Sequence, residues 1–584
     1  MKFCSWKLIK LLVSKRPSQL KNNLTCLSIT LFNYTRKNLK NIKKGGKMAG
    51  NIQTGKISII LTYSDKIPYK IEDFNDMIKS IFSQSYKNFE VILTDKRGES
   101  AKPDYLEDKI KNNKKFVYLP INFKNRANAI NQAIDKSKGK FILLINNESA
   151  PVFLKKSALN TFVMAMNLNK KAGMVYSDYE LITDGSVREI HLLDYHRGRL
   201  MDSVDFGRAI CYSKKVLESV GKLTEKYNVA DLYDLRLKVS EKYDLVLISN
   251  RYNGSLYSAV AQAVGHNVFD YLLASKQTQL EMEDAVTEHL KRTGAYLAPG
   301  ANHHKVVYTE KEEQQFKDCI ATVVIPVNNR PEFISTAIES VQNQTIKNIE
   351  VIVVVNGGPQ DPTNKVVKQY MKGGVKYDPS KPPVSLITLD VNNIGLCLNM
   401  GINEARGKYY VQLDSDDRLK PNAVEKIVKT FDSDPTAAMV IGSYEVWQKD
   451  EVTEEIKRKE DIPVVTHDEW TFGNGRNNLL RINGAGAPRS AHIKIMKELG
   501  WFGMNDSPFS RNYGEDYDFV HRAAEQYNIG RVWEPIYDVI RHKGGTDHSI
   551  DQQTIDRNNN AKDYMRLEAI LRRQKINKQL SKNK

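Results

Sequence analysis

Four polar residues, Asp414-Ser415-Asp416-Asp417, follow the apolar run YYVQL at the end of an expected strand over 409–413. Carboxylates clustered in this way repel one another, so a bound cation or nearby basic groups must offset their charge. Hard oxygen ligands suit Mg²⁺ or Mn²⁺, ions that also bridge phosphate oxygens. The alternative interpretation is an ordinary turn after a strand, where Asp and Ser are favoured in any case.

Two further features of the same half of the chain carry ionisable groups. Glu515 and Asp516 precede the amphipathic pattern YDFVHRAAEQY. These carboxylates either cap a helix or supply a general base, and neighbouring acids can divide the two roles. His542 follows the β-like run IYDVI. It is either a structural residue or, as a neutral imidazole, a metal ligand.

The elements that must position these groups alternate between strands and helices. Short β-branched runs occur at ISIIL (57–61) and TVVIP (322–326), and each is followed by an amphipathic helix pattern and a second apolar run. This alternation predicts an α/β fold with a mostly parallel sheet covered on both faces. Ligands of such sheets bind beyond the carboxyl ends of the strands, which is where the polar residues fall.

The same blocks occur twice in the chain. SIFSQSYKNFEVIL (80–93) matches SVQNQTIKNIEVIV (340–353), and GKFILLINNES (139–149) matches GKYYVQLDSDD (407–417). Two later blocks match in the same order, with offsets that grow slowly along the chain. This pattern indicates a duplicated domain rather than a short-period repeat.

Composition excludes several classes of protein. Of 584 residues, 41% are apolar and 27% are charged, which is typical of a globular chain, and no apolar run reaches the length of a membrane span. The five scattered cysteines form no CxxC pair, which argues against a disulfide framework or a zinc ribbon and suits a reducing, cytoplasmic compartment.

The net charge of +18 is concentrated at one end. Residues 1–50 hold 12 Lys and Arg and no acidic residue, whereas the rest holds 75 basic and 69 acidic residues. The body of the chain is therefore only mildly basic and shows no nucleic-acid-reading motif, so we expect no nucleic-acid partner. The leader has three interpretations: peripheral attachment through residues 1–47 to the inner face of a membrane, a transit peptide, or a solvated extension upstream of Met48.

We expect five parts along the chain. They are a basic leader (1–50), a first domain (51–265), a helical linker (266–318), a second domain (319–550) and a basic C-terminal helix and tail (551–584). The last part has a helical pattern through AKDYMRLEAILRR (561–573), after which we expect it to fray.

The second copy resembles a family 2 glycosyltransferase with the GT-A fold. The resemblance lies in VVIPVNNRPEFISTAIESVQNQTIKNIEVIVVVNGG, NNIGLCLNMGINEARGKYYVQLDSDD, GEDYDFVHRA and RHKGG, which occur in the family's order between residues 323 and 545. It implies two tandem, Rossmann-like GT-A domains. It also implies an inverting, metal-dependent hexosyl- or N-acetylhexosaminyltransferase that uses a nucleotide sugar, most simply a UDP-sugar, and a glycan, lipid-linked or protein acceptor.

The resemblance also implies a role for individual residues. Asp414 and Asp416 match the family's metal-binding Asp-x-Asp, His542 matches the late histidine that reaches the Mn²⁺ or Mg²⁺ ion or the diphosphate, and Asp516 matches the catalytic base with Glu515 as its acidic neighbour. Pro326 and Asn356 are expected in loops that hold the nucleotide base. The donor-binding set is Pro326, Asn356, Asn393, Asp414 and Ser415.

The chain departs from the family pattern at two places. Val355-Asn356 stands where the family often has two acids, although an amide oxygen still accepts a hydrogen bond from a base N–H. Cys397-Leu398-Asn399 stands where the family often has Ala-Arg-Asn, so a phosphate-side arginine is missing.

The first copy retains the frame without the acids. The local offsets place Asn146-Asn147-Glu148 at the position of Asp414-Ser415-Asp416, Leu232 at that of Asp516 with Asp231 beside it, and Ser258 at that of His542. We therefore expect a degenerate first copy. The alternatives are a two-site glycan polymerase, a nucleotidyltransferase and a non-catalytic carbohydrate-binding scaffold. Asp516 argues against a nucleotidyltransferase, which needs no base there, and the acids and the histidine of the second copy argue against a scaffold.

Overall fold

The computed structural model describes residues 52–250, 254–261, 275–467, 473–482, 484, 486–504, 513–543 and 551–582. The chain divides into two compact units, Met1–Thr54 and Gly55–Lys584, and every element below belongs to the second unit. The leader interpretations for residues 1–50 lie outside the described residues.

The first copy contains a sheet of seven strands. Its spatial order is β10-β6-β9-β4-β1-β2-β3, and β9 alone runs antiparallel to its neighbours. The strands are β1 (Ile57–Tyr63), β2 (Phe89–Asp95), β3 (Phe116–Pro120), β4 (Phe141–Ile145), β6 (Ala172–Ser177), β9 (Ala209–Ser213) and β10 (Asp244–Ile248). A smaller sheet beside it comprises β5 (Val152–Leu154), β11 (Tyr257–Val260), β7 (Tyr179–Thr183) and β8 (Ser186–Ile190).

The second copy repeats this order in one larger sheet. Its order is β14-β13-β12-β15-β19-β17-β20-β16, with β18 paired to β17. The strands are β12 (Ala321–Val327), β13 (Ile349–Val355), β14 (Val384–Thr388), β15 (Tyr409–Gln412), β16 (Arg418–Leu419), β17 (Ala437–Lys449), β18 (Ile456–Arg458), β19 (Arg489–His492) and β20 (Asn528–Arg541).

The register and the interior contacts confirm the duplication. Ile57 of β1 pairs with the first residues of β2 and β4, and Ala321 of β12 pairs in the same way with the first residues of β13 and β15. Gln84 donates to the Lys155 carbonyl and accepts from the Leu159 N–H. Gln344 makes the same two contacts with Lys420 and Val424. A shared polar contact of this kind follows from common ancestry of the copies rather than from similar composition.

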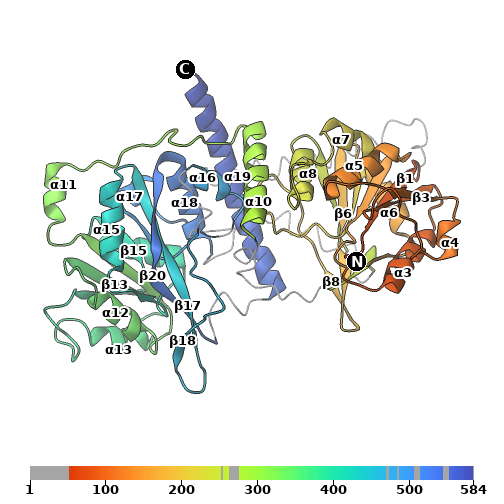
Figure 1. Cartoon of the computed structure of the whole chain (residues 1–584). Coiled ribbons are helices and arrows are strands. Elements are labelled where there is room, and N and C mark those ends of the chain that lie inside the picture. The colour runs from red at the N-terminus through yellow and green to blue at the C-terminus, as the bar shows by residue number, and fades with distance from the viewer. Residues whose placement is uncertain are drawn as a thin grey trace, which may run out of the picture. The chain divides into compact units, whose positions relative to one another are not determined.

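Helices cover both faces of each sheet (Figure 1). The continuous apolar runs are buried along their whole length, as expected for central parallel strands. Alternate residues of β12 serve different faces, because Val323 packs with α12 and α15 whereas Val324 packs with α14 and α18. The helices of the two copies are α3 (Ile71–Phe82), α4 (Asp108–Lys111), α5 (Arg126–Lys136), α6 (Ala158–Leu168), α7 (Lys214–Ser219), α8 (Asp231–Ser240), α12 (Ile334–Gln342), α13 (Thr363–Lys368), α14 (Ile394–Glu404), α15 (Ala423–Ser433), α16 (Gly475–Asn478), α17 (Ile493–Glu498) and α18 (Glu515–Gln526).

Within the part of the chain that the structure describes, three helices lie outside the two copies in sequence. Between the copies, α10 (Lys276–Thr293) ends at Gly294, whose φ of 74° forms the expected left-handed cap, and α11 (Glu310–Gln315) follows. The last helix, α19 (Gln552–Lys582), continues past Arg573, where we expected fraying. No helix among the described residues is both long and apolar enough to cross a membrane.

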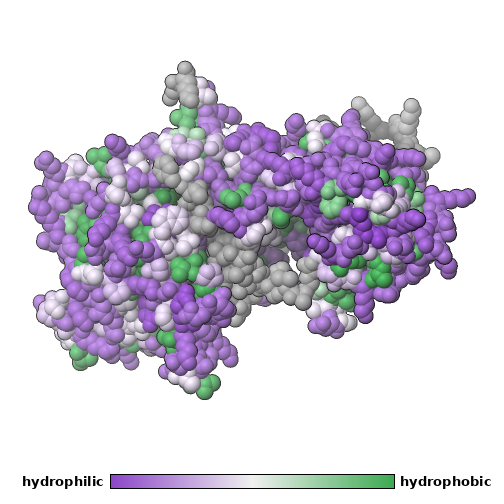
Figure 2. All heavy atoms as spheres, viewed as in Figure 1, coloured by the Kyte–Doolittle hydropathy of each residue, from purple (hydrophilic) through white to green (hydrophobic). Residues whose placement is uncertain are grey.

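The coloured surface in Figure 2 is mostly hydrophilic, and its hydrophobic side chains are scattered over the visible face. The apolar residues of the chain instead form buried clusters on both sides of each sheet. Because the faces of each sheet are covered by apolar clusters, we expect the ionisable side chains of a functional site at the ends of the strands.

Candidate active site at the carboxyl edge of the second sheet

The acidic turn directly follows β15. The Asp417 N–H donates to the Asp414 carbonyl at 3.1 Å, which closes the turn. Tyr537 of β20 accepts from the Asp414 N–H at 3.1 Å, and Gln412 Nε2 donates to Asp414 Oδ1 at 3.1 Å. The turn interpretation is therefore confirmed, and contacts from two strands hold the loop in place.

Asp416 faces two basic groups. His542 Nε2 lies 2.9 Å from Asp416 Oδ2, and the Arg330 guanidinium forms an ion pair with the same oxygen. Burial opposes ionisation of Asp416, but the hydrogen bond from His542 and the charge of Arg330 outweigh it and lower the pKa of the carboxyl. The hydrogen bond to Asp416 in turn raises the pKa of His542. The basic groups expected from the acid cluster are thus present.

Asp417 has the opposite environment. Its carboxylate is 7% exposed and accepts from the Ile540 N–H at 2.8 Å. Burial, and then the charges of Asp416 and Asp414, raise the pKa of Asp417 well above its usual value. A proton on Asp417 lowers the total charge of the cluster.

The two acids predicted before a helix lie in its first turn. Gly514, with a φ of 84°, is the N-cap of α18, and no side chain caps this helix end. Neither acid is the N-cap residue, because both already belong to the helix, but Asp516 Oδ1 accepts from the Tyr517 N–H at 2.7 Å within the first turn.

Glu515 and Asp516 differ in protonation. Asp516 Oδ2 lies 2.8 Å from Arg489 Nε of β19. Burial opposes ionisation of Asp516, but the charges of Arg489 and Lys562 lower its pKa overall. Burial and the charge of Asp516 raise the pKa of Glu515 to about 8. The lowered pKa favours the ionised form of Asp516, whereas the raised pKa favours the neutral form of Glu515.

Arg489 connects the two acidic groups. The charges of Asp516, Asp414 and Glu515 together outweigh burial and raise its pKa. A single guanidinium that is influenced by all three carboxyls indicates that the turn after β15 and the start of α18 face the same region.

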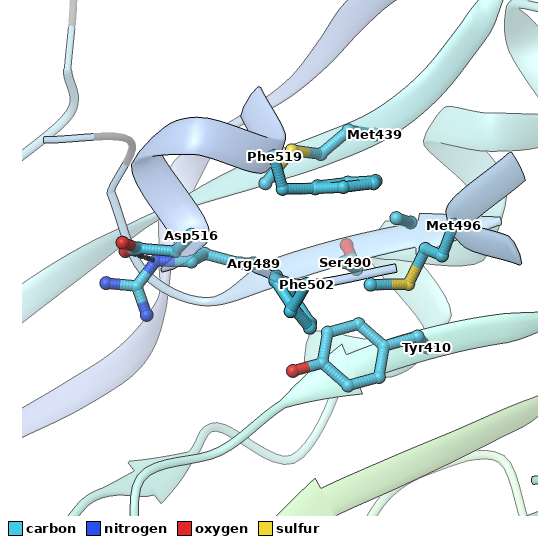
Figure 3. Close-up of a pocket in the computed structure, with 9 residues that line it drawn as sticks. Tyr410, Met439, Arg489, Ser490, Met496, Phe502, Asp516 and Phe519 are labelled. Carbon is cyan, nitrogen blue, oxygen red and sulfur yellow. Dashed lines mark ion pairs between the residues drawn. The ribbon is translucent and has the colours of Figure 1, made fainter. Parts of the chain in front are cut away.

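A small pocket lies beside this ion pair. Figure 3 shows Arg489 and Asp516 together at one end and mostly apolar side chains at the other. The lining residues are Tyr410, Met439, Arg489, Ser490, Ala491, Met496, Phe502, Asp516 and Phe519. Most of these residues belong to the apolar cluster between the sheet and α18, so the pocket lies within the surface against which α18 packs.

The predicted donor residues lie at the same edge, with one correction. Pro326 is inside β12 and pairs with Val354, so the prediction of a loop position is wrong. Pro326 belongs to the continuous apolar run ATVVIPV, which is why β12 extends through this residue. Asn393 caps α14 by accepting from the Leu396 N–H, and Ser415 is 6% exposed within the acidic turn.

Asn356 directly follows β13 and is 6% exposed. Its Nδ2 donates to Asn392 Oδ1 at 3.1 Å, whereas its buried Oδ1 has no hydrogen-bond partner among the described residues. A buried acceptor without a partner is costly, so this oxygen marks a place where a ligand donor fits.

The predicted metal set is only partly assembled. His542 and Asp416 are in contact, but within the described ranges no three His, Cys, Asp or Glu side chains gather as a group able to hold a metal ion. The carboxylate and imidazole donors of Asp414, Asp416 and His542 nevertheless have the chemistry that Mn²⁺ accepts.

Three basic residues of the site were missed in the sequence. Arg330 follows β12 within a motif whose neighbours were identified, so its place after a strand was an available signal. Arg489 lies on a short strand and Lys562 lies on α19, and neither has a spacing that links it to Asp516. Only the packing of these elements brings them together.

The equivalent edge of the first copy is filled by its own side chains. Asn147 donates to the Thr62 carbonyl at 2.8 Å and accepts from the Thr62 N–H at 3.1 Å. Glu148 forms ion pairs with Lys96 and Arg126. Arg126 also pairs with Asp231, so the basic and acidic groups here compensate one another.

The structure also tests which residues of the first copy correspond to Asp516 and His542 of the second. Leu232 is the second residue of α8, as Asp516 is of α18, which supports their equivalence. Ser258 pairs with Glu180 in the same way that Asp538 pairs with Glu445. Ser258 therefore corresponds to Asp538, and its assignment to His542 is wrong because the offset between the copies changes between α8 and β11. The position matching His542, residue 262, lies outside the described residues.

Comparison with known proteins identifies both copies. Residues 59–151 and 322–497 match the model of the family described as Glycosyl transferase family 2. Two regions of the chain, which together make up slightly less than half of its 584 residues, are thus similar to glycosyltransferase family 2. One match begins within β1 and the other within β12, so each copy has its own region of similarity to the family.

The chain is also similar to individual proteins, one of which is named as a glycosyltransferase. A Rickettsia felis protein named "Uncharacterized glycosyltransferase" is 23% identical over 527 residues, covering 86% of this chain and 82% of its own length. The chondroitin synthase of Pasteurella multocida is 33% identical over 121 residues, which is 21% of this chain and 12% of that protein. The crystal structure of S. aureus TarS 1–349 has 16% identity and a TM-score of 0.30, covering 38% of this chain and 60% of that one, a score too low to bear on the site.

Proposed function

We propose that the second copy transfers a sugar, with inversion, from a nucleotide-sugar donor to a hydroxyl group of a glycan, lipid-linked or protein acceptor. The observation that carries this proposal is the placement of the ionised Asp516 beside Arg489, whose charge environment also includes Asp414. An ionised carboxylate next to an acidic strand-end turn supplies both a proton acceptor and a diphosphate-binding edge.

The transfer needs one bond to form as another breaks. Asp516 takes the proton from the acceptor hydroxyl, whose oxygen attacks the anomeric carbon from the face opposite the leaving group. The bond between that carbon and the donor diphosphate breaks, and the electron pair leaves with the nucleoside diphosphate. A single displacement of this kind inverts the anomeric centre without an enzyme nucleophile.

The remaining residues hold the donor. The free Asn356 Oδ1 accepts from an N–H of the nucleotide base, and uracil offers such a donor. Arg330 lies at Asp416 and supplies positive charge for the diphosphate, in place of the missing arginine near Cys397. When Mn²⁺ or Mg²⁺ is held by Asp414, Asp416 and His542, it further stabilises charge on the leaving group.

A glycan acceptor is favoured by the relatives named for polysaccharide synthesis, such as the chondroitin synthase of Escherichia coli, which is 30% identical over 142 residues. That similarity covers 23% of this chain and 20% of the synthase. We therefore propose a class of acceptor, a glycan, and no particular polysaccharide.

A donor screen tests the proposal. UDP-, GDP- and other nucleotide sugars are added with and without Mn²⁺, and the unfolding temperature is measured; a donor at 100 times its Kd should add about 2.7 kcal/mol of stability. The product formed from the stabilising donor is then analysed by NMR for its anomeric configuration. Retention at the anomeric carbon, or no stabilisation by any nucleotide sugar, would refute the proposal.

A further inference from the structure

The C-terminal helix α19 contacts the first copy through buried charges. Arg199, in the loop after β8, is 1% exposed, and its Nη1 lies 2.8 Å from Asp563 Oδ2 on α19. Its Nη2 donates to Asn560 Oδ1 at 2.9 Å. The neighbouring Gly198 lies so close to α19 that a Cβ there would come within 1.9 Å of the Asp563 carbonyl oxygen. The loop and the helix therefore fit together without room for a methyl group.

The same helix contacts the catalytic helix α18 of the second copy (Figure 1). Arg566 Nη1 donates to Asp563 Oδ1 at 2.6 Å, and Arg566 Nε donates to the Tyr517 hydroxyl at 2.9 Å. Tyr517 directly follows Asp516. The contacts thus run from Arg199 through Asp563 and Arg566 to the residue next to the proposed base.

Two further side chains of α19 surround the start of α18. Met565 packs against Gly514, the N-cap of α18. The Lys562 ammonium lies over the rings of Tyr513 and Tyr517, 4.6 and 5.3 Å from their centres. The first turn of α18 is therefore held by α19 on the side that carries Asp516 and Tyr517.

Burial makes this connection stiff. Asp563 and Arg566 are fully buried and Arg199 nearly so. Removing one member of a buried charge set leaves the others uncompensated, so the set keeps its geometry or is lost as a whole. A change in the first copy at Arg199 is therefore transmitted to α19 and from there to α18.

We propose that the first copy positions the catalytic helix of the second copy through α19, with Arg199, Asp563 and Arg566 as positioning residues. The kinetic part of this inference rests on the proposed role of Asp516 as the base. The structural part concerns the stability of the start of α18 and holds for any reaction at this edge.

Hydrogen–deuterium exchange tests the structural part without a substrate. Arg199→Met should speed exchange of the amides from Asp518 to Ala523, and Gly198→Ala should do the same by displacing α19 without changing any charge. Arg572→Met is the matched control, because Arg572 of α19 pairs at 2.8 Å with Glu525 in the last turn of α18. Its effect should be confined to that end. Unchanged exchange of Asp518–Ala523 in both test variants would overturn the inference. Asp563→Asn replaces Arg199→Met if that variant does not fold.

Kinetics with the donor found in the screen test the second part. Arg199→Met should lower kcat by about 10- to 100-fold while the Kd for the donor nucleotide stays unchanged, because displacement of the base misplaces a group that acts only on the acceptor. Arg199→Lys, which keeps the charge, should recover part of kcat, and Arg572→Met should keep the wild-type value. Equal kcat values for Arg199→Met and Arg572→Met would overturn the positioning role. If the wild-type protein turns over no donor, the proposed function fails while the exchange result still decides the coupling.

Discussion

Glu515 and Asp516 are neighbours in sequence, yet the pKa of one carboxyl is raised and that of the other is lowered. Asp516 is kept ionised mainly by Arg489, whereas Glu515 is buried beside a negative charge and is protonated to about pH 8. Two carboxyls with pKa values pushed apart divide the acid and base roles of a site. The pair thus avoids placing two negative charges in one helix turn, and it leaves Asp516 as the candidate proton acceptor.

Asp516→Asn tests the base at the residue scale. The amide keeps the size of the side chain but takes no proton, so kcat should fall by about 10²- to 10⁴-fold while donor binding is retained. Initial-rate kinetics and donor-induced thermal stabilisation measure the two effects separately. Turnover near the wild-type value would remove Asp516 from the mechanism.

The protonation of Glu515 predicts a pH-dependent stability. Because its pKa is raised by folding to about 8, the folded state binds a proton that the unfolded state has lost, and stability falls as the pH rises from about 4.5 to 8. Glu515→Gln removes this loss. Its stability relative to wild type should therefore increase between pH 5 and pH 8, by at least about 1 kcal/mol, the value of roughly one pKa unit. Urea unfolding at both pH values measures the difference, and parallel pH profiles for the two proteins would contradict it.

The acids were predictable from the sequence and their basic partners were not. Asp414, Asp416 and Asp516 each follow a strand or open a helix, which is a local signal. Arg489 and Lys562 reach Asp516 only through the packing of β19 and α19 against α18, and no local pattern encodes that arrangement. Burial likewise decides which of two adjacent acids is ionised.

At the scale of elements, α18 begins at a glycine for two independent reasons. Gly514 has a φ of 84°, which side chains rarely adopt, and a Cβ at this position would lie 2.8 Å from Met565 Cε. The backbone turn that starts the catalytic helix is thus matched to the surface of α19.

Gly514→Ala should destabilise the protein more than an equivalent change elsewhere. Gly373→Ala is the control, because its φ of 89° imposes similar strain while nothing lies within 4 Å of the added methyl. We expect the control to lose about 1–2 kcal/mol of unfolding free energy through strain alone, and Gly514→Ala to lose about 1–3 kcal/mol more through overpacking. Equal losses in urea unfolding would show that Met565 moves aside freely.

The strands could be predicted and the extent of the last helix could not. Continuous apolar runs such as IEVIVVV have one stable location, the centre of a parallel sheet. Beyond Arg573 the sequence of α19 is polar, which favoured fraying. Gln574 and Asn577 instead donate to the backbone carbonyls of Thr293, Gly294 and Tyr296, so contacts distant in sequence extend the helix.

At the scale of the whole molecule, the two copies share a frame and differ at one edge. The strand order, the register and the Gln84 and Gln344 contacts are common to both. The acidic edge of the second copy faces Arg330 and His542, whereas that of the first copy is closed by Lys96, Arg126 and Glu148. The repeat was readable in the sequence because the frame is encoded by local apolar patterns.

Equivalent substitutions in the two copies should have unequal effects. Asp416→Ala removes the partner of Arg330 and His542, and we expect metal-dependent donor affinity to fall by at least about tenfold. Glu148→Ala, at the matching position of the first copy, should leave turnover largely unchanged. Metal titrations and initial rates on both variants make the comparison. Loss of all turnover in Glu148→Ala would show that the first copy carries out chemistry.

The order of the elements along the chain has a consequence for biosynthesis. The residues of α18 leave the ribosome before those of α19. Two contacts at the start of α18 come from α19, because Arg566 donates to the Tyr517 hydroxyl and Met565 packs against Gly514. A nascent chain that already exposes every acid of the site therefore still lacks the helix that packs against the first turn of α18. The enzyme is expected to acquire its activity abruptly, when residue 566 has emerged from the ribosome, rather than gradually as the second domain emerges.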